Sequence, residues 1–209
     1  MPGPVRIDLH VHSNASHDSR TAPAAVALAS RRLGLDPIFL TDHDTVAGAL
    51  QLKATGVPVV VGEEITTADG ELIGIFLERE VASRLPAHDT AGRIKEQGGL
   101  VYLQHPYDQF RRHLTETAIE EIADQIDIVE VFNARSDEEA NRRAADLCLT
   151  LGAAAGAGSD AHRFSEIGSM YVELPTFEGA QAFLASLRQA RIVTRPSRLL
   201  LRAKHWLHR

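Results

Sequence analysis

The feature that most constrains this chain is a repeated order: a short apolar stretch ends in histidine or an acidic residue, and a helix-like stretch follows. Repeated strand–helix units form a parallel sheet covered by helices, and the C-terminal ends of its strands meet at one edge. Polar residues that are distant in the sequence are therefore expected to converge on one site. The residues at these predicted strand ends are His10 and His12, His43, Glu63 and Glu64, His105, Asn133, and Asp160 with His162.

The first apolar stretch predicts a strand over residues 5–11. Isoleucine, leucine and valine alternate there with Asp8, His10 and the following His12, so one face is apolar and the other carries potential ligands. An additional strand is expected in "ELIGIFLE", after the turn "ADG". On the pattern alone, an open doubly wound sheet and a closed barrel are both compatible with the chain. We find no internal repeat or linker and expect one domain over residues 1–209.

The charge of the chain is distributed unevenly. All 28 acidic residues but only 15 of the 22 basic ones lie in residues 1–178, and the other seven basic residues follow. An acidic body predicts a protein that does not bind duplex nucleic acid, whose recognition depends on contacts with phosphates. For the basic tail at about 195–209 we favour docking on its own domain or a subunit partner, which leaves a homo-oligomer open.

A cytoplasmic, non-membrane protein is expected. The only cysteine is Cys148, so the chain has no disulfide framework and no cysteine-based zinc site. The first ten residues contain no apolar signal segment, and no apolar run is long enough to span a bilayer. Histidine with aspartate and glutamate, in the absence of cysteine, favours zinc, manganese or iron, with magnesium as a further candidate.

The motifs "DLHVHS", "TDHDT", "GEE", "QHP" and "GSDAH", in this order, resemble the PHP (polymerase and histidinol phosphatase) family of metal-dependent phosphoesterases. The resemblance extends from about residue 6 through "GSDAH" into "EIGSMYVEL". It implies an α/β fold, a distorted (βα)7-type barrel. It also implies two or three divalent metal ions at the C-terminal rim of that barrel.

Carried over position by position, the resemblance assigns His10 and His12 to one metal, with a bridging glutamate and an aspartate. Glu64 is the expected bridge and Glu63 the alternative; Asp18 is expected in the first loop, with His17 as the alternative. Asn133 stands where a fuller pattern has histidine, which leaves a two-metal site open. The full set of expected ligands is His10, His12, Asp18, His43, Glu64, His105, Asp160 and His162.

The resulting hypothesis is the hydrolysis of a phosphate ester by a metal-bound hydroxide. The expected substrate is a small phosphorylated metabolite, a nucleotide or a sugar phosphate. We expect Asp160, His105 and Arg135 to act in catalysis, and Arg135 and Arg20 to bind the substrate phosphate, since guanidinium suits bidentate phosphate contacts. Arg163 is interpreted as a surface residue. The alternatives are a noncatalytic metal-binding module and an exonuclease that acts on short single-stranded ends.

Overall fold

The fold is built on a curled, six-stranded mixed sheet. The structure is a computed structural model and describes residues 3–195. β4 runs antiparallel to both of its neighbours, and the other pairs are parallel. In spatial order the strands are β2 (Ile38–His43), β3 (Val59–Thr67), β4 (Gly70–Ile75), β5 (Leu100–Leu103), β6 (Ile128–Asn133) and β7 (Ala154–Gly158).

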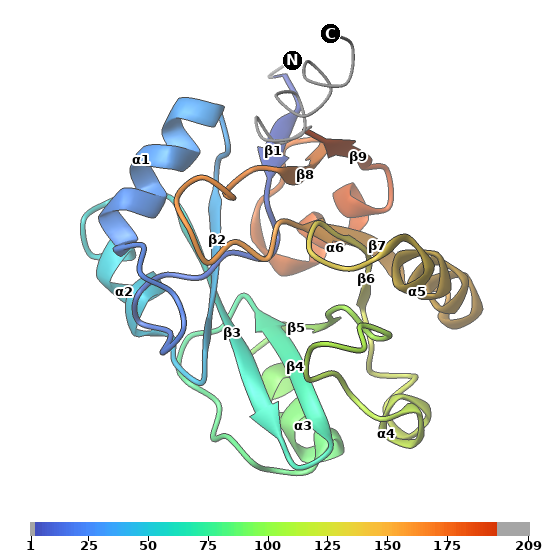
Figure 1. Cartoon of the computed structure of the whole chain (residues 1–209). Coiled ribbons are helices and arrows are strands. Elements are labelled where there is room, and N and C mark those ends of the chain that lie inside the picture. Colours follow the sequence, from blue (N-terminus) through green and yellow to red (C-terminus); the bar gives the residue numbers. More distant parts are fainter. Residues whose placement is uncertain (1–2, 196–209) are drawn as a thin grey trace, which may run out of the picture.

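A second, antiparallel sheet lies at one end of the first (Figure 1). It consists of β1 (Val5–Ile7), β8 (Met170–Leu174) and β9 (Arg191–Thr194), with β8 in the middle. Helix α6 (Gly179–Leu187) connects β8 to β9 and packs against the inside of the curl. The sequence reading had not assigned a strand to the β8 segment.

The first strand is shorter than predicted. β1 ends at Ile7, and the following residues cross between the two edges of the curled sheet. The Leu9 amide donates to the Ala157 carbonyl of β7, and the Thr41 amide of β2 donates to the Val11 carbonyl at 2.9 Å. This irregular segment covers the gap between β2 and β7.

Within residues 3–195 the structure confirms a mixed α/β fold with a curled half-barrel sheet, and it does not confirm the predicted closed (βα)7-type barrel. The antiparallel β4 departs from the βα repeat, because it follows β3 directly after a tight turn. The pair of edge strands, β2 and β7, is bridged by the 8–12 segment through single contacts, including one isolated bridge between Val11 and Ala161.

Helices surround the curled sheet (Figure 1). Gly34 after α1 and Gly152 after α5 adopt the left-handed conformation, with φ of 69° and 65°, and end those helices. The side chains of Thr115 and Asp137 accept amide hydrogen bonds at the starts of α4 and α5. The bounds are α1 (Pro23–Leu33), α2 (Ala47–Lys53), α3 (Ala87–Glu96), α4 (Glu116–Glu121) and α5 (Glu138–Leu151).

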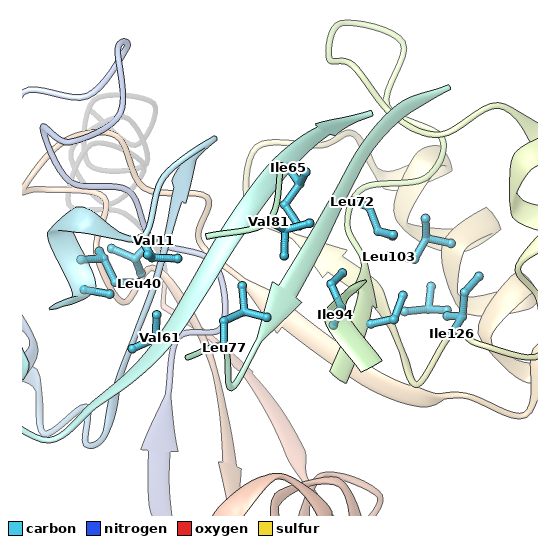
Figure 2. Close-up of a cluster of buried hydrophobic side chains, with 14 of the residues drawn as sticks. Val11, Leu40, Val61, Ile65, Leu72, Leu77, Val81, Ile94, Leu103 and Ile126 are labelled. Carbon is cyan, nitrogen blue, oxygen red and sulfur yellow. The ribbon is translucent and has the colours of Figure 1, made fainter. Parts of the chain in front are cut away.

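The two faces of the curled sheet bury two separate apolar clusters. Leu40, Val61 and Leu103 belong to the cluster on the convex face, part of which is shown in Figure 2. Their strand neighbours Phe39 and Val60 point to the concave face, where they pack with residues of β1, β8 and α6. Because side chains alternate along a strand, the ends of the concave rows are free to carry polar groups.

The basic tail expected at about 195–209 lies outside the described residues, except for Arg195. In the part of the chain that the structure describes, the helices are too short or too polar to cross a lipid bilayer.

Gly158 at the end of β7 provides a test of this packing. A Cβ atom there would collide with the Cβ of His10 and lie 2.9 Å from Glu130 Oε1. We expect Gly158→Ala to lower the free energy of unfolding by about 1–3 kcal/mol, because the added methyl group would overpack the core. Gly92→Ala in α3 is the control, since nothing lies within 4 Å of its added Cβ; equal losses in urea denaturation would contradict the prediction.

Candidate metal centre

The carboxylate of Glu64 lies among four imidazoles on the concave face. Its Oε2 atom is 3.1 Å from His10 Nε2, 3.2 Å from His12 Nε2 and 3.6 Å from His43 Nε2. Its Oε1 atom is 3.3 Å from His105 Nε2. Two ligand atoms that share one zinc or manganese ion lie roughly 3.4 Å apart, given bond lengths of about 2.1 Å.

Asp160 contributes a second carboxylate to the cluster. Its Oδ1 atom lies 3.8 Å from His10 Nε2 and 3.6 Å from His12 Nε2. Asp18 faces the outer edge of the cluster, where its Oδ2 atom is 2.9 Å from His162 Nε2 and 3.6 Å from His43 Nε2. Within described residues, His12, Asp18, His43 and His162 form one potential metal-binding group, and His10, His12 and Asp160 form another.

All eight residues expected as ligands are thus brought together, and their role as ligands stays a prediction. The surroundings orient the rings. Glu130 Oε1 accepts from His10 Nδ1 at 3.1 Å, and Ser16 Oγ lies 3.2 Å from His12 Nδ1. Such contacts fix the tautomer and leave Nε2 facing the cluster.

Two of these residues, His105 and Asp160, have a left-handed backbone conformation that orients their side chains toward the cluster. His105 and Asp160 have positive φ angles of 27° and 51°, a conformation that costs about 1–3 kcal/mol for residues other than glycine. The buried Asp8 fixes the segment around Asp160, because its carboxylate accepts from the amides of Ser159 and Gly168. Asp8 therefore positions the loop that carries Asp160 and makes no contact with an imidazole ring among the described residues.

The donor set fits a divalent metal. The fully buried His12 Nε2, which faces the cluster, has no hydrogen-bond partner among the residues that the structure describes. Unsatisfied buried polar atoms are costly, and three buried imidazoles beside two buried carboxylates are compatible with cation binding. The cluster is therefore compatible with metal binding.

The electrostatics of the cluster favour ionised carboxylates. Burial by itself raises the pKa of Asp160, but His10 and His12 outweigh it and lower that pKa to about 2. Burial likewise raises the pKa of Glu64, and the imidazoles of His10, His105 and His12 bring it well below its usual range. Both groups are therefore ready to bind a cation at neutral pH.

Of the two residues that the sequence left as alternatives, Glu63 lies away from the cluster and His17 lines the cavity over it. Glu63 is on the convex face, where its Oε2 atom accepts from the Val81 amide at 2.8 Å. His17 is exposed beside the ring of His43. Asn133 is buried, and its side-chain amide donates to Glu130 at 3.0 Å and to Asp160 at 3.3 Å.

Arginines line the space beside the cluster. Arg135 Nη1 donates to the Asp160 carbonyl at 3.2 Å and lies 2.7 Å from His162 Nδ1. It lines both a cavity of about 250 Å³ over the cluster and a neighbouring cavity of about 700 Å³. Arg20 and Arg163 line the larger cavity only.

Three polar residues of the site were missed by the sequence reading. Glu71 lies at the same rim as Glu64, because the antiparallel β4 brings its N-terminal end there. Glu130 lies within β6 and not at its end, and a bulge in β6 follows it. Arg111 reaches the site from the loop after β5 and contacts Asp160 Oδ2 at 3.2 Å. A strand-end rule for parallel sheets detects none of these positions.

Comparisons with known proteins bear on the family and the fold of this chain. A family model described as PHP-associated matches residues 138–192. The Methanocaldococcus jannaschii protein MJ1587 is 34% identical over 144 residues, covering 62% of this chain and 82% of the relative. MJ0417 of the same organism is 33% identical over 175 residues, covering 81% and 70%. The chain belongs to the PHP family.

Solved structures share the PHP fold with this chain. A two-domain protein from Bacteroides vulgatus, described as containing a predicted PHP-like metal-dependent phosphoesterase, has a TM-score of 0.72 at 20% identity, over 95% of this chain and 68% of that chain. Endonuclease Q, in complex with a duplex substrate bearing an abasic lesion, has a TM-score of 0.63 at 15% identity. That match covers 89% of this PHP chain but only 57% of the endonuclease.

The exclusion of duplex nucleic acid is wrong as a sequence-based prediction, because Endonuclease Q combines this fold with a bound duplex. The prediction used the net charge of the whole body. The cavities beside the cluster bring together the arginines Arg20, Arg111, Arg112, Arg135 and Arg163 and the acidic residues Asp18, Glu64, Glu71, Asp160 and Glu166. The local potential at a site, and not the net charge, determines whether phosphates bind there.

The buried carboxyl group of Glu63 makes the stability of the folded protein depend on pH. Burial raises its pKa from 4.5 to about 8. Between these two pH values the unfolded chain loses the proton and the folded chain retains it, so the folded state loses stability as the pH rises. We expect Glu63→Gln to remove roughly 2–4 kcal/mol of this loss.

The measurement is thermal unfolding followed by circular dichroism, at several pH values between 4.5 and 8. The advantage in Tm of Glu63→Gln over the wild type should increase across that range. Glu78→Gln is the matched control, because Glu78 is exposed. A constant difference between Glu63→Gln and the wild type would contradict the prediction.

Proposed function

We propose that this PHP protein is a metal-dependent phosphoesterase that hydrolyses phosphate esters. The observation that carries the proposal is the Glu64 carboxylate, which lies within 3.6 Å of four imidazole nitrogens beside a cavity lined by arginines. The solved structures of this fold include one described as a predicted metal-dependent phosphoesterase and a lesion-specific endonuclease, which supports phosphoester chemistry.

Two or three divalent ions, manganese, zinc or iron, with magnesium as a further candidate, would be held by the eight residues of the cluster. Divalent ions in such a site supply a water of lowered pKa and neutralise charge on phosphoryl oxygens. The proposed ligands are His10, His12, Asp18, His43, Glu64, His105, Asp160 and His162.

The protein itself supplies orientation and charge. Asp160 and His105 act at the reacting end of the cavity, where the conformation of the backbone fixes both side chains. Glu130 holds His10 with Nε2 toward the cluster. A preorganised site of this kind does not have to rearrange as charge develops on the phosphoryl group.

Arg135 is the proposed phosphate-binding residue, with Arg20 as a second contact farther out. The side chain of Arg135 is 42% exposed, so its guanidinium is accessible from the cavity while Nη1 contacts Asp160 and His162. A charge-assisted hydrogen bond to phosphate contributes about 1.5–3 kcal/mol.

Two classes of substrate follow from the cavities. The smaller cavity, of about 250 Å³, accommodates the phosphate of a small metabolite such as a nucleotide or sugar phosphate. The larger cavity, of about 700 Å³ and lined by Arg20, Arg135 and Arg163, favours a nuclease as the second candidate. Hydrolysis of p-nitrophenyl phosphate, nucleotides, and single-stranded and duplex oligonucleotides separates them, and a steep loss of binding with salt identifies a polymer substrate.

Glu64 is the residue whose loss should be most severe. We expect Glu64→Gln to lower metal content and to reduce kcat by more than about 100-fold. This exceeds the loss of about 10–100-fold that follows when a residue hydrogen-bonded to a metal ligand is replaced, because Glu64 is itself a proposed ligand. Elemental analysis and phosphatase assays before and after chelation are the measurements. Glu63→Gln is the adjacent control and should retain metal; full activity in metal-stripped protein would disprove the proposed function.

Arg135 should affect substrate binding more than metal content. We expect Arg135→Ala to raise KM by about 10–100-fold, because a charge-assisted contact with phosphate is lost. Arg93→Ala in α3 is the control, since the Arg93 side chain is 61% exposed and lines neither cavity. The measurement is steady-state kinetics on the phosphoester that the protein hydrolyses fastest. Equal values of KM for both variants would show that Arg135 does not bind the substrate phosphate.

A further inference from the structure

One nitrogen of Arg111 lies among four side-chain oxygens. Arg111 Nη1 is 3.0 Å from Asp108 Oδ2, 3.2 Å from Asp160 Oδ2, 3.3 Å from Asn133 Oδ1 and 3.5 Å from Ser136 Oγ. These oxygens come from the loops after β5 and β7 and from the end of β6 and the turn that follows it. Segments that are distant in sequence therefore meet around one positive charge.

The oxygens are oriented as ligands of a cation would be. The side-chain amide of Asn133 donates to Glu130 and Asp160, and its carbonyl oxygen accepts from the Arg135 amide at 2.8 Å and from Arg111. The hydroxyl of Ser136 donates to Asp108 Oδ2 at 2.7 Å, which leaves its lone pairs for Arg111. Two carboxylates, an amide oxygen and a hydroxyl are the ligands that hard divalent cations prefer.

This group of oxygens shares Asp160 with the metal centre. Asp160 Oδ1 faces His10 and His12, whereas Oδ2 faces Arg111. Both Asp160 and Asp108 are nearly fully buried, with exposed fractions of 2% and 4%. Buried carboxylates need a positive partner, and here the protein supplies it.

We propose that Arg111 fills an oxygen-lined cation site at the Asn133 end of the metal centre. The guanidinium takes the place of a divalent ion there, and the site becomes available when Arg111 is removed. This inference goes beyond the proposed function, because it concerns where cations bind and does not require that the protein hydrolyses any ester.

The charge of Arg111, and not its bulk, is the property that matters. Arg111→Met has a similar length but no charge, and it leaves Asp108 and Asp160 without their cation. Arg111→Lys retains a positive charge that can lie among the same oxygens. The two variants therefore separate loss of charge from loss of packing.

The experiment counts Mn²⁺ ions per chain by isothermal titration calorimetry and by electron paramagnetic resonance, without any activity assay. Arg111→Met should bind about one more Mn²⁺ than the wild type, because a set of hard oxygen ligands becomes free. Arg111→Lys should match the wild type. Adding Asp108→Asn to Arg111→Met should remove the additional ion.

An Arg111→Met protein that binds as many Mn²⁺ ions as the wild type, or fewer, would overturn the inference, since Arg111 would then only hold Asp160 in place. Asn133→His keeps Arg111 and covers the case in which Arg111→Met does not fold. It should bind no more Mn²⁺ than the wild type, and an additional ion there would also overturn the inference. A wild type that binds no metal refutes the proposed function, whereas the difference between variants tests Arg111.

Discussion

The buried carboxylate of Glu64 is the group on which the rest of the site depends. A carboxylate that is 1% exposed is costly unless positive groups or a metal surround it, and four imidazoles from three separate segments lie around it. His10 and His12 come from the crossing segment, His43 from β2 and His105 from the loop after β5. The curl of the sheet is what brings these segments within reach of one side chain.

Alternation along the strands separates the core from the chemistry. On the concave face, Phe39 and His43 stand in the same row of β2, and Val60 and Glu64 in the same row of β3, so each row is apolar at one end and polar at the other. The neighbouring Glu63 points to the convex face and is separated from the cluster by the sheet itself. A shift of one residue in the register of β3 would exchange these two glutamates.

The sequence was sufficient to predict the site residues that lie at the C-terminal ends of parallel strands. His43 in β2 and Asp160 in the loop that follows β7 were found in this way. In β3 the rule gave the pair Glu63 and Glu64, and the family resemblance selected Glu64 from it. The sequence was insufficient where the chain departs from the rule. Glu71 was missed because β4 is antiparallel. The pattern alone did not separate an open sheet from the closed barrel that the resemblance implies, and it does not reveal that the 8–12 segment crosses the gap as irregular chain. The direction of a strand depends on long-range pairing, which a local pattern does not report.

The charges illustrate the same difference between local and global properties. The chain is acidic overall, and its acidic residues include the buried carboxylates Glu64, Glu130 and Asp160, which the protein surrounds with imidazoles and with Arg111. A buried, compensated carboxylate contributes little to the field that an approaching phosphate meets. Arg20, Arg135 and Arg163, which line the larger cavity, contribute more, because they are exposed. A net charge counts both kinds equally, and for this reason it is a poor guide to whether a phosphorylated substrate, small or polymeric, can approach this site.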